Sequence, residues 1–293
     1  MKAIVKTLYN ALPFKQTLFS VLKQVWTPKE SVFKHLHFKG VFTVPIDGST
    51  SFMINHYGYQ VENDIFWAGL TKGWEKESLK LWIKLCEECE SIIDIGANTG
   101  VYTLTAKAVN PSSKVYAFEP IERVYNKLTA NIRLNNFDIL AVKMAASNKD
   151  GTAIFYDTST EHTYSASVNR NLLLSQTSSI IQTTIETITL NSFIKQNGIT
   201  HIDLLKIDVE THEPEVLQGF SEYLATFRPA MLIEILTDEI GNRVHNMLQG
   251  LDYLYFNIDE SLGARQVEKI TKTRHDNYLI CNAETARRIG LIE

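Results

Sequence analysis

The sequence contains few of the features that mark secreted, membrane-spanning or nucleic-acid-binding proteins. Only three of its 293 residues are cysteine, an odd number that predicts no disulfide framework and favours a reducing compartment. No apolar run is long enough to span a bilayer, and no continuous hydrophobic segment resembles a secretory signal. Lysine and arginine total 29 against 33 acidic residues, so the net charge of −4 provides no basic excess for nucleic acid. We therefore expect a cytoplasmic globular protein whose main ligand is not nucleic acid.

The three cysteines also lack the spacing of a metal or redox site. Cys86 and Cys89 form a C-x-x-C late in a helical pattern, whereas redox pairs begin a helix directly after a strand. A zinc site needs a second such pair, and Cys281 stands alone. We expect buried or partly buried free thiols.

The start of the chain is basic: the first 29 residues contain five lysines and no acidic residue. Their apolar residues recur at roughly helical spacing, which Pro13 interrupts. One interpretation is a basic amphipathic segment in peripheral contact with an anionic membrane or a partner. The other, which we favour, is a helix docked on the domain or an undocked tail. Residues 30–66 alternate in short runs that predict hairpin strands. We predict an N-terminal appendage over residues 1–74 and a main domain over residues 75–293.

The most informative pattern is a strand–turn–helix–strand unit that begins at Ser91–Gly100. An apolar strand leads into a glycine turn, a helix follows at about 100–109, and a second apolar strand at 114–118 ends at Glu119. Such a unit forms a nucleoside-binding crevice at the carboxyl ends of parallel strands. Glu119 lies 19 residues after Gly100, where a carboxylate can accept hydrogen bonds from both ribose hydroxyls.

The residues of the turn indicate which nucleoside it binds. A dinucleotide fingerprint reads G-x-G-x-x-G, so that backbone N–H groups cradle a pyrophosphate. Here the turn reads D-x-G-x-N-x-G, with Asn98 in place of the middle glycine and Asp94 at the strand end. A carboxylate at that point would repel a pyrophosphate and suits a cationic cofactor. S-adenosylmethionine, which has an ammonium, a sulfonium and a ribose but no phosphate, fits this requirement.

Beyond this motif, strands alternate with helical patterns, which predicts an α/β fold with a parallel sheet. We expect a third strand at "ILAVKMAAS", a polar binding loop or lid at 157–179 and a fourth parallel strand at "HIDLLKID". The other segments that we expect are helices over 121–134, 213–226 and 240–249, a strand at "AMLIEIL", and a closing antiparallel pair at "YLYFNI" and "NYLIC".

Acidic residues gather where the predicted fourth strand ends. Asp208 and Glu210 lie at its carboxyl edge, where open α/β sheets bind ligands, and His212 and Glu213 follow. Glu234 interrupts the next apolar strand, an unfavourable place for a charge unless it faces a site. If the group that accepts the methyl of the cofactor is a hydroxyl, a base can take its proton, and Asp208, Glu210 and His212 are the candidates. The structural alternative is a solvated strand end whose acids stabilise the next helix.

Two further possibilities concern the same edge. A carboxylate pair can hold a divalent metal that acidifies the hydroxyl, an alternative that we favour less. His162 in the polar loop can face a substrate, although a solvated loop histidine is the more common case.

The segments "IIDIGANTGVYTLTA", "VYAFEP" and "LLKIDVETHEPEVLQG" resemble the FkbM-type methyltransferases, as does "VENDIFWAGLTKGWEKES" upstream. The resemblance covers roughly Phe52–Leu236. It implies an S-adenosylmethionine-dependent O-methyltransferase with the class I, Rossmann-like fold, in which helices cover both faces of a seven-stranded, mostly parallel sheet. It also implies that the acceptor is a small molecule or glycan hydroxyl, in particular that of a sugar or glycan precursor.

The resemblance implies roles for individual residues. Glu75 would cap the amino end of the cofactor, although an ordinary helix acid is the alternative. Asn98 and Thr99 would line the methionine part, Pro120 would flank the ribose acid, and Ala146 would lie near the adenine. The residues that we expect to bind the cofactor are Glu75, Asp94, Gly96, Asn98, Thr99, Gly100, Glu119, Pro120, Ala146 and Asp208.

Two departures from the family pattern stand out. Thr211 occupies a position where the family has glycine, and a β-branched residue disfavours positive φ. Either the turn does not need a positive φ, or the loop is reshaped. Related metal-dependent sugar O-methyltransferases have an adjacent acidic or amide pair on the next strand, whereas here Ile235 and Leu236 follow Glu234.

Two other functions compete with methyl transfer. An NAD-dependent oxidoreductase or epimerase is disfavoured by Asp94 and Asn98 and by the lack of a suitably placed Y-x-x-x-K pair. A non-catalytic binding module that kept the fold is favoured mainly by Thr211. The sequence does not indicate the oligomeric state.

Overall fold

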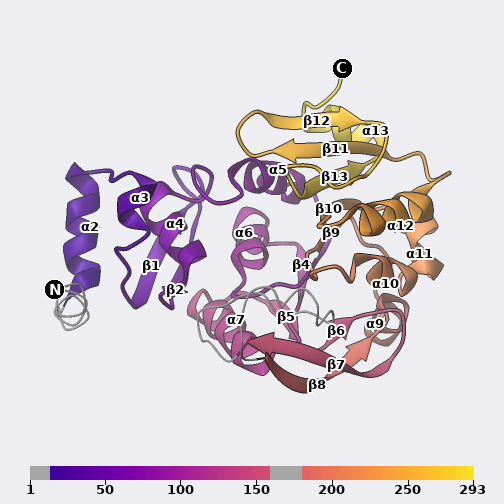
Figure 1. Cartoon of the computed structure of the whole chain (residues 1–293), viewed down its shortest axis with the longest axis horizontal. Helices are drawn as coiled ribbons and strands as arrows, with labels where there is room; N and C mark the ends of the chain where they lie inside the picture. The colour runs from indigo at the N-terminus through magenta and orange to yellow at the C-terminus, as the bar shows by residue number, and fades with distance from the viewer. Residues whose placement is uncertain (1–13, 159–179) are drawn as a thin grey trace. The chain divides into compact units, whose positions relative to one another are not determined.

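The computed structural model describes residues 14–158 and 180–293. The chain divides into two compact units, 1–74 and 75–293, and Figure 1 draws the helices and strands of both. His162 and most of the polar loop expected at 157–179 lie outside the described residues. Among the residues described we find no helix whose length and apolar character suffice to span a bilayer.

The first unit contains short helices and one β-hairpin. Its elements are α2 (Lys15–Val25), α3 (Glu30–Phe33), β1 (Gly40–Pro45), β2 (Ser51–His56) and α4 (Gln60–Ala68). The two strands pair antiparallel, as predicted. The prediction of strands over 30–66 is wrong at both ends, where α3 and α4 form. Gly58 ends the alternation, and α4 then buries Glu62, Ile65 and Phe66 at helical spacing.

Aromatic rings fill the core of this unit. Phe19 of α2 packs against Phe38 and Trp67, with ring centroids 6.4 and 5.5 Å away. Phe66 lies 4.7 Å from Phe38 and 5.4 Å from Phe42 in edge-on arrangements, which aromatic pairs prefer. One side of α2 is therefore fixed on the core.

The second unit is built on an eight-stranded sheet with the order β12-β11-β13-β10-β9-β3-β4-β5. The neighbours from β10 to β5 pair parallel, and the remaining pairs are antiparallel. The strands are β3 (Ser91–Ile95), β4 (Lys114–Phe118), β5 (Ile139–Val142), β9 (Leu204–Ile207), β10 (Ala230–Glu234), β11 (Leu254–Asp259), β12 (Gly263–Val267) and β13 (Asn277–Cys281). The predicted parallel sheet and closing antiparallel pair are confirmed. The predicted count of seven is wrong because β12, a largely polar edge strand, adds an eighth.

Helices cover both faces of this sheet, as expected. They are α5 (Lys76–Cys86), α6 (Val101–Val109), α7 (Glu122–Leu134), α9 (Leu190–Asn197), α10 (Glu213–Gln218), α11 (Ser221–Phe227), α12 (Asp238–Leu248) and α13 (Ala283–Arg288). Ile93, Leu205 and Met231 share one buried cluster with residues of α9 to α12. Helices α5 and α6 pack beside each other over the opposite face (Figure 1).

Two predicted elements are each divided in the structure. The helix expected over 213–226 breaks into α10 and α11 at Gly219, where a Cβ atom would lie 2.0 Å from the Ser147 carbonyl oxygen. The strand expected at "ILAVKMAAS" breaks into β5 and β6 (Ala145–Ala146). Strand β6 leaves the main sheet and joins β7 (Gly151–Thr158) and β8 (Ile180–Ile188) in a small three-stranded sheet.

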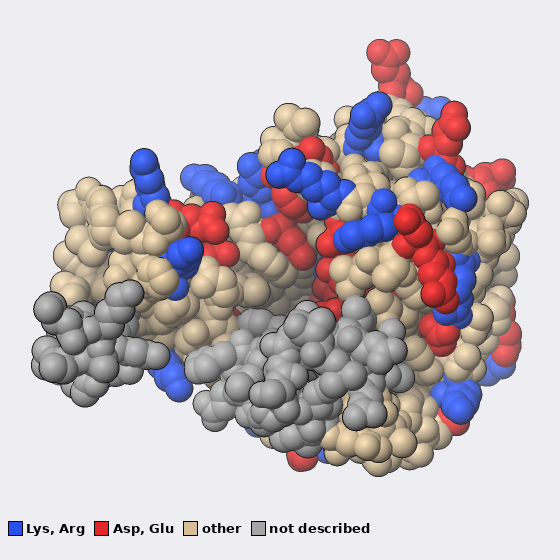
Figure 2. Space-filling view, viewed as in Figure 1, with Lys and Arg blue, Asp and Glu red and all other residues tan. Residues whose placement is uncertain are grey.

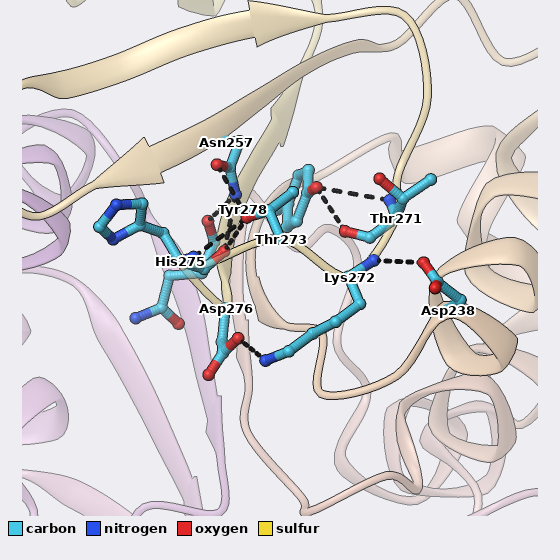
Figure 3. Close-up of polar contacts among 9 residues, drawn as sticks. Asp238, Asn257, Thr271, Lys272, Thr273, His275, Asp276 and Tyr278 are labelled. Atoms are coloured by element: carbon cyan, nitrogen blue, oxygen red, sulfur yellow. Dashed lines mark hydrogen bonds and ion pairs between the residues drawn. The ribbon is translucent and has the colours of Figure 1, made fainter.

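The segment between β12 and β13 is held by hydrogen bonds that Figure 3 shows. The Tyr278 hydroxyl donates to the Thr271 carbonyl over 2.6 Å, and the Asn257 amide donates to the His275 carbonyl over 2.8 Å. These bonds fix the start of β13, where Asn277 forms a hydrogen bond with the Glu75 side chain.

The three cysteines are free and buried, which confirms the prediction of free thiols. Burial raises the pKa of Cys89 and of Cys281 to about 12. Because the thiolate is the reactive form, these thiols are poor nucleophiles.

Candidate active site

The loop between β3 and α6 depends on three residues in the left-handed region. Gly96, Asn98 and Gly100 have φ values of 82°, 51° and 97°. Glycine adopts this region freely, and asparagine tolerates it better than most residues. The amides of Gly96 and Ala97 both donate to the Phe118 carbonyl, over 3.0 and 2.9 Å, and this ties the loop to the end of β4. The glycine turn predicted from the sequence is thus a turn that needs its glycines.

Glu119 joins the two parts of the first motif. One carboxylate oxygen accepts from the Ile121 amide over 2.9 Å, and the other accepts from the Asn98 amide over 3.2 Å. The side chain is held at the end of β4, beside the loop, as a ribose-binding carboxylate requires. Pro120 follows it and is partly buried, while Thr99 is buried and its carbonyl accepts from Asn131 over 2.8 Å.

Asn98 presents an acceptor at the same place. Its Oδ1 atom is buried and has no hydrogen-bond partner among the residues that the structure describes. An orphaned carbonyl oxygen is costly unless a ligand donor satisfies it. The residues of this loop therefore fit a nucleoside cofactor that carries a donor group, such as an ammonium.

Gly96 also brings the second motif against the first. A Cβ atom at this position would lie 1.9 Å from the Asp208 carbonyl oxygen, so only glycine permits the approach. The Asp208 amide donates to the Ile95 carbonyl over 3.0 Å on the same side. The β3–α6 loop and the acidic edge after β9 are therefore in direct contact.

Lys206, which our sequence analysis did not single out, lies at the centre of the acidic residues. It is only 3% exposed, its Nζ atom lies 2.7 Å from a carboxylate oxygen of Asp208, and it sits 4.5 Å above the ring of Tyr102. Burial lowers its pKa, but the charges of Asp208, Glu75 and Asp94 outweigh burial and raise the pKa well above the usual value. The signal that could have identified it is a lysine inside the apolar strand "LLKI".

Two of the predicted cofactor residues lie beside this lysine. Glu75 adopts φ 42° directly before α5, and one of its carboxylate oxygens accepts from the Tyr102 hydroxyl over 2.5 Å. Asp94 is 1% exposed and accepts from the Thr103 hydroxyl over 2.5 Å. Burial raises the pKa of both carboxyls, that of Asp94 to about 6, while Lys206 opposes the shift. Asp94 is thus buried at the end of β3, and its contact with a cofactor stays a prediction.

Helix α5, which begins directly after Glu75, is capped from a distant hairpin. Glu260, in the turn between β11 and β12, accepts from the Glu77 amide over 2.7 Å and from the Ser78 hydroxyl over 2.5 Å. A carboxylate at a helix N-terminus satisfies free N–H groups and stabilises the helix dipole. Glu260 was not predicted, because the contact joins positions 182 and 183 residues apart.

The loop after β9 contains two adjacent residues in the left-handed region. Glu210 has φ 54° and Thr211 has φ 78°, so this turn does need the positive φ that the family glycine provides. Glu213 stabilises the turn by accepting from the Val209 and Thr211 amides, each over 3.2 Å. The loop is therefore formed despite the threonine, at the cost of strain at position 211.

The acids of this edge have raised pKa values. Burial, and then the charge of Asp208, raise the pKa of Glu210 to about 7. Burial raises the pKa of Glu213 to about 8, and burial with nearby Asp208 and Glu210 raises that of Glu234 to about 10. Glu234 therefore does face the acidic edge, which accounts for a carboxyl at the end of an apolar strand. Groups with pKa values near neutrality can accept a proton at working pH.

His212 lies apart from these acids. Its Nε2 atom is 3.0 Å from the Ser147 hydroxyl, its Nδ1 atom is 3.6 Å from Glu215, and its charged neighbours are Glu215 and Arg243. Burial lowers its pKa. Ala146, 2% exposed in β6, immediately precedes Ser147. The structure thus places His212 near the predicted adenine side, and its role as a base stays a prediction.

Within residues 14–158 and 180–293, no group of three or more His, Cys, Asp or Glu side chains is arranged to hold a metal ion. At the acidic edge the cation in place is the ammonium of Lys206.

Comparison with known proteins identifies related methyltransferases. A family profile described as "Methyltransferase FkbM domain" matches residues 94–263. The hexuronic acid methyltransferase AglP of Haloferax volcanii is 26% identical over 152 residues, which cover 51% of this chain and 58% of that protein. The 31-O-demethyl-FK506 methyltransferase FkbM of Streptomyces tacrolimicus is 29% identical over 156 residues, covering 45% of this chain and 59% of that protein. The methyltransferase sdnD of Sordaria araneosa is 27% identical over 156 residues, covering 45% and 60%.

The chain thus spans about 60% of the length of the curated relatives that it matches. Among solved structures, the methyltransferase FkbM of Methylobacillus flagellatus aligns with a TM-score of 0.43 at 16% identity, covering 65% of this chain and 43% of that one.

Proposed function

Because the chain belongs to the FkbM methyltransferase family, we propose that it transfers a methyl group from S-adenosylmethionine to a hydroxyl of a sugar or glycan precursor. The observation that carries the proposal is the contact between two loops: Gly96 packs on the backbone of Asp208, which supports a single site built from the β3–α6 loop and the acidic edge. When bound, the cofactor supplies a methyl group activated by its sulfonium charge.

In this proposal, Glu119 accepts hydrogen bonds from the ribose hydroxyls. The backbone amides of Asn98 and Ile121, which donate to the same carboxylate, keep it in place. Asn98 Oδ1 and the Glu75 carboxylate provide acceptors for the ammonium. Lys206 balances part of the negative charge below them, so that the acids stay packed together without a bound ligand.

We propose Glu210 as the base that takes the proton of the acceptor hydroxyl, with Asp208 as the positioning group. Glu210 has a pKa of about 7, the range in which a base works best at neutral pH. Asp208 is held by Lys206 at 2.7 Å and is better suited to orient a hydroxyl than to take its proton. The acceptor class rests on the names of the relatives, which include a hexuronic acid methyltransferase.

We also propose a small acceptor rather than nucleic acid and a reducing, cytoplasmic setting. The net charge of −4 supports the first, and three buried free thiols support the second.

Titration calorimetry with S-adenosylhomocysteine and with NAD tests the cofactor. We expect heat with the former and none with the latter, and the reverse result would favour an oxidoreductase. Glu119→Gln should weaken S-adenosylhomocysteine binding by about tenfold or more, because it removes a charge-assisted acceptor. The matched control is Glu122→Gln, an exposed acid in the first turn of α7.

A panel of acceptors tests the reaction. Asp208→Asn and Glu210→Gln should each abolish methyl transfer to a hexuronic acid or another sugar. The Glu210→Gln variant should still bind S-adenosylhomocysteine. If a wild-type protein that binds S-adenosylhomocysteine methylates nothing in the panel, a binding module becomes the better interpretation. Modification of a peptide or lipid instead of a sugar would overturn the acceptor class alone.

A further inference from the structure

Helix α2 has a second apolar side that does not face the core of its unit. Phe19, on the inner side, is 4% exposed. By contrast, Phe14, Leu18, Val21 and Val25 are 81%, 52%, 58% and 83% exposed. Their spacing of three or four residues places Leu18, Val21 and Val25 along one line of the helix, and exposed Phe14 directly precedes the helix as its N-cap. We call these four residues the α2 stripe.

Such a stripe is unusual for a surface helix. A helix at the surface of a globular unit normally turns its polar side to water. Exposed apolar residues are common singly, but a contiguous line of them indicates a contact surface. Trp26, 42% exposed, directly follows the helix and extends the apolar surface. Figure 2 shows the surface over α2 as largely uncharged.

The stripe lies in a part of the sequence that has an excess of positive charge. The first 29 residues contain five lysines and no acidic residue. Residues 1–74 contain eight lysines, no arginine and four acidic residues, a net charge of +4, although the whole chain has a net charge of −4. Positive charge is thus concentrated in the unit that carries the exposed apolar line.

We propose that the α2 stripe binds the surface of an anionic lipid bilayer, with the helix lying in the interfacial region. Apolar side chains enter the acyl boundary, aromatic residues such as Phe14 and Trp26 suit the interface, and lysines attract anionic headgroups. A second copy of this chain is a poorer occupant, because two units of the same net positive charge repel each other. This inference does not depend on the methyl-transfer reaction.

Vesicle flotation of the full-length protein tests the proposal without any measurement of activity. We expect the wild type to float with vesicles of equal parts phosphatidylcholine and phosphatidylglycerol, and much less with phosphatidylcholine alone. High salt should weaken the binding, since it screens the lysines. Leu18→Glu and Val21→Glu should each reduce partitioning by about tenfold, because a charge replaces an apolar anchor.

Leu262→Glu is the matched control, since Leu262 is 88% exposed in the turn between β11 and β12 of the other unit. It should float like the wild type. All three substitutions alter exposed side chains, so the melting temperatures measured by circular dichroism should not change. The proposal would be overturned if the wild-type protein does not float with anionic vesicles. It would also be overturned if the Leu18→Glu and Val21→Glu variants float as well as the wild type. If the protein does not bind vesicles but forms concentration-dependent dimers that Val21→Glu abolishes, the stripe binds a second copy of the chain instead.

Discussion

At the residue scale, the loop after β9 combines backbone strain with buried acids. Thr211 has φ 78°, a conformation that suits glycine and costs a β-branched residue of order 1 kcal/mol. We predict that Thr211→Gly raises the free energy of unfolding by about 1 kcal/mol, because the amide that donates to Glu213 is kept while the strain is removed. Urea denaturation measures the change.

Thr211→Ala is the control for that prediction. It retains a Cβ atom at the same φ, and its stability should stay within about 0.5 kcal/mol of the wild type. A Thr211→Gly protein less stable than Thr211→Ala would contradict the prediction, because the entropy that glycine adds to the unfolded chain would then outweigh the strain that it relieves.

Lys206 is the second residue whose replacement should have a large effect. Lys206→Met leaves Glu75, Asp94 and Asp208 without their buried cation, and we expect a loss of about 3 kcal/mol in unfolding free energy at neutral pH. Loss of the cation raises the pKa of Asp94 further, so protons can neutralise the acids at low pH. The destabilisation should therefore be smaller at about pH 5 than at about pH 8.

Lys107→Met provides the comparison, because Lys107 is also buried but donates to a backbone carbonyl, that of Ser113, over 2.6 Å. Its loss should cost about 1 kcal/mol with little dependence on pH. Equal, pH-independent losses in both variants would mean that Lys206 acts through packing rather than charge.

At the scale of secondary-structure elements, the turn between β11 and β12 supports the start of α5. Glu260→Ala removes the acceptor for the Glu77 amide and the Ser78 hydroxyl, and should cost about 1 kcal/mol in unfolding free energy. Since Glu75 directly precedes α5, S-adenosylhomocysteine affinity should also fall severalfold. Glu268→Ala, at an exposed acid just after β12, should change neither measurement. Unchanged affinity in Glu260→Ala would mean that Glu75 is held by its other contacts.

The elements differ in how far the sequence could predict them. The strand Ser91–Ile95 and its loop were predictable because apolar periodicity, glycines and a terminal acid all occur within a short stretch. The break at Gly219 was not, because it depends on the close approach of the Ser147 carbonyl from a distant segment. Strand β12 was missed because an edge strand with exposed polar residues has no apolar alternation.

The same distinction applies to the site. Glu119 and Asp208 follow directly after predicted strands, so their place at the carboxyl edge could be inferred. The positions of Lys206 and Glu260 follow from tertiary contacts that no local pattern encodes. His212 is next to the acids in sequence, yet it contacts Ser147, because the turn through Thr211 redirects the chain.

At the scale of the whole molecule, the buried carboxyls make stability depend on pH. Burial raises the pKa of Asp94 to about 6, of Glu210 to about 7 and of Glu213 to about 8, all above the ordinary values near 4. Each group therefore favours the folded state when protonated, and its contribution is lost as pH rises through the folded pKa. We predict that the unfolding free energy decreases between about pH 5 and about pH 8.

Glu213→Gln should flatten this decrease, since the amide resembles the protonated acid and can still accept from the Val209 amide. Glu239→Gln, at an exposed acid of α12, should leave the slope unchanged. His56 acts in the opposite sense: burial lowers its pKa to about 4, so its contribution is lost below about pH 6.5. Denaturation over a pH series would show a maximum in the mildly acidic range, and a maximum at alkaline pH would contradict the assignment.

The missing side chain at position 96 joins two parts of the site that lie far apart in the sequence. A single added methyl group would meet the Asp208 carbonyl at 1.9 Å, so no room is left for a side chain between the β3–α6 loop and the acidic edge. If the two loops form the proposed site, we expect a substitution that shifts one loop to disturb the other, so that cofactor binding and methyl transfer change together. On the proposed function, we therefore expect a change of acceptor to need substitutions elsewhere, with the Gly96–Asp208 contact left intact.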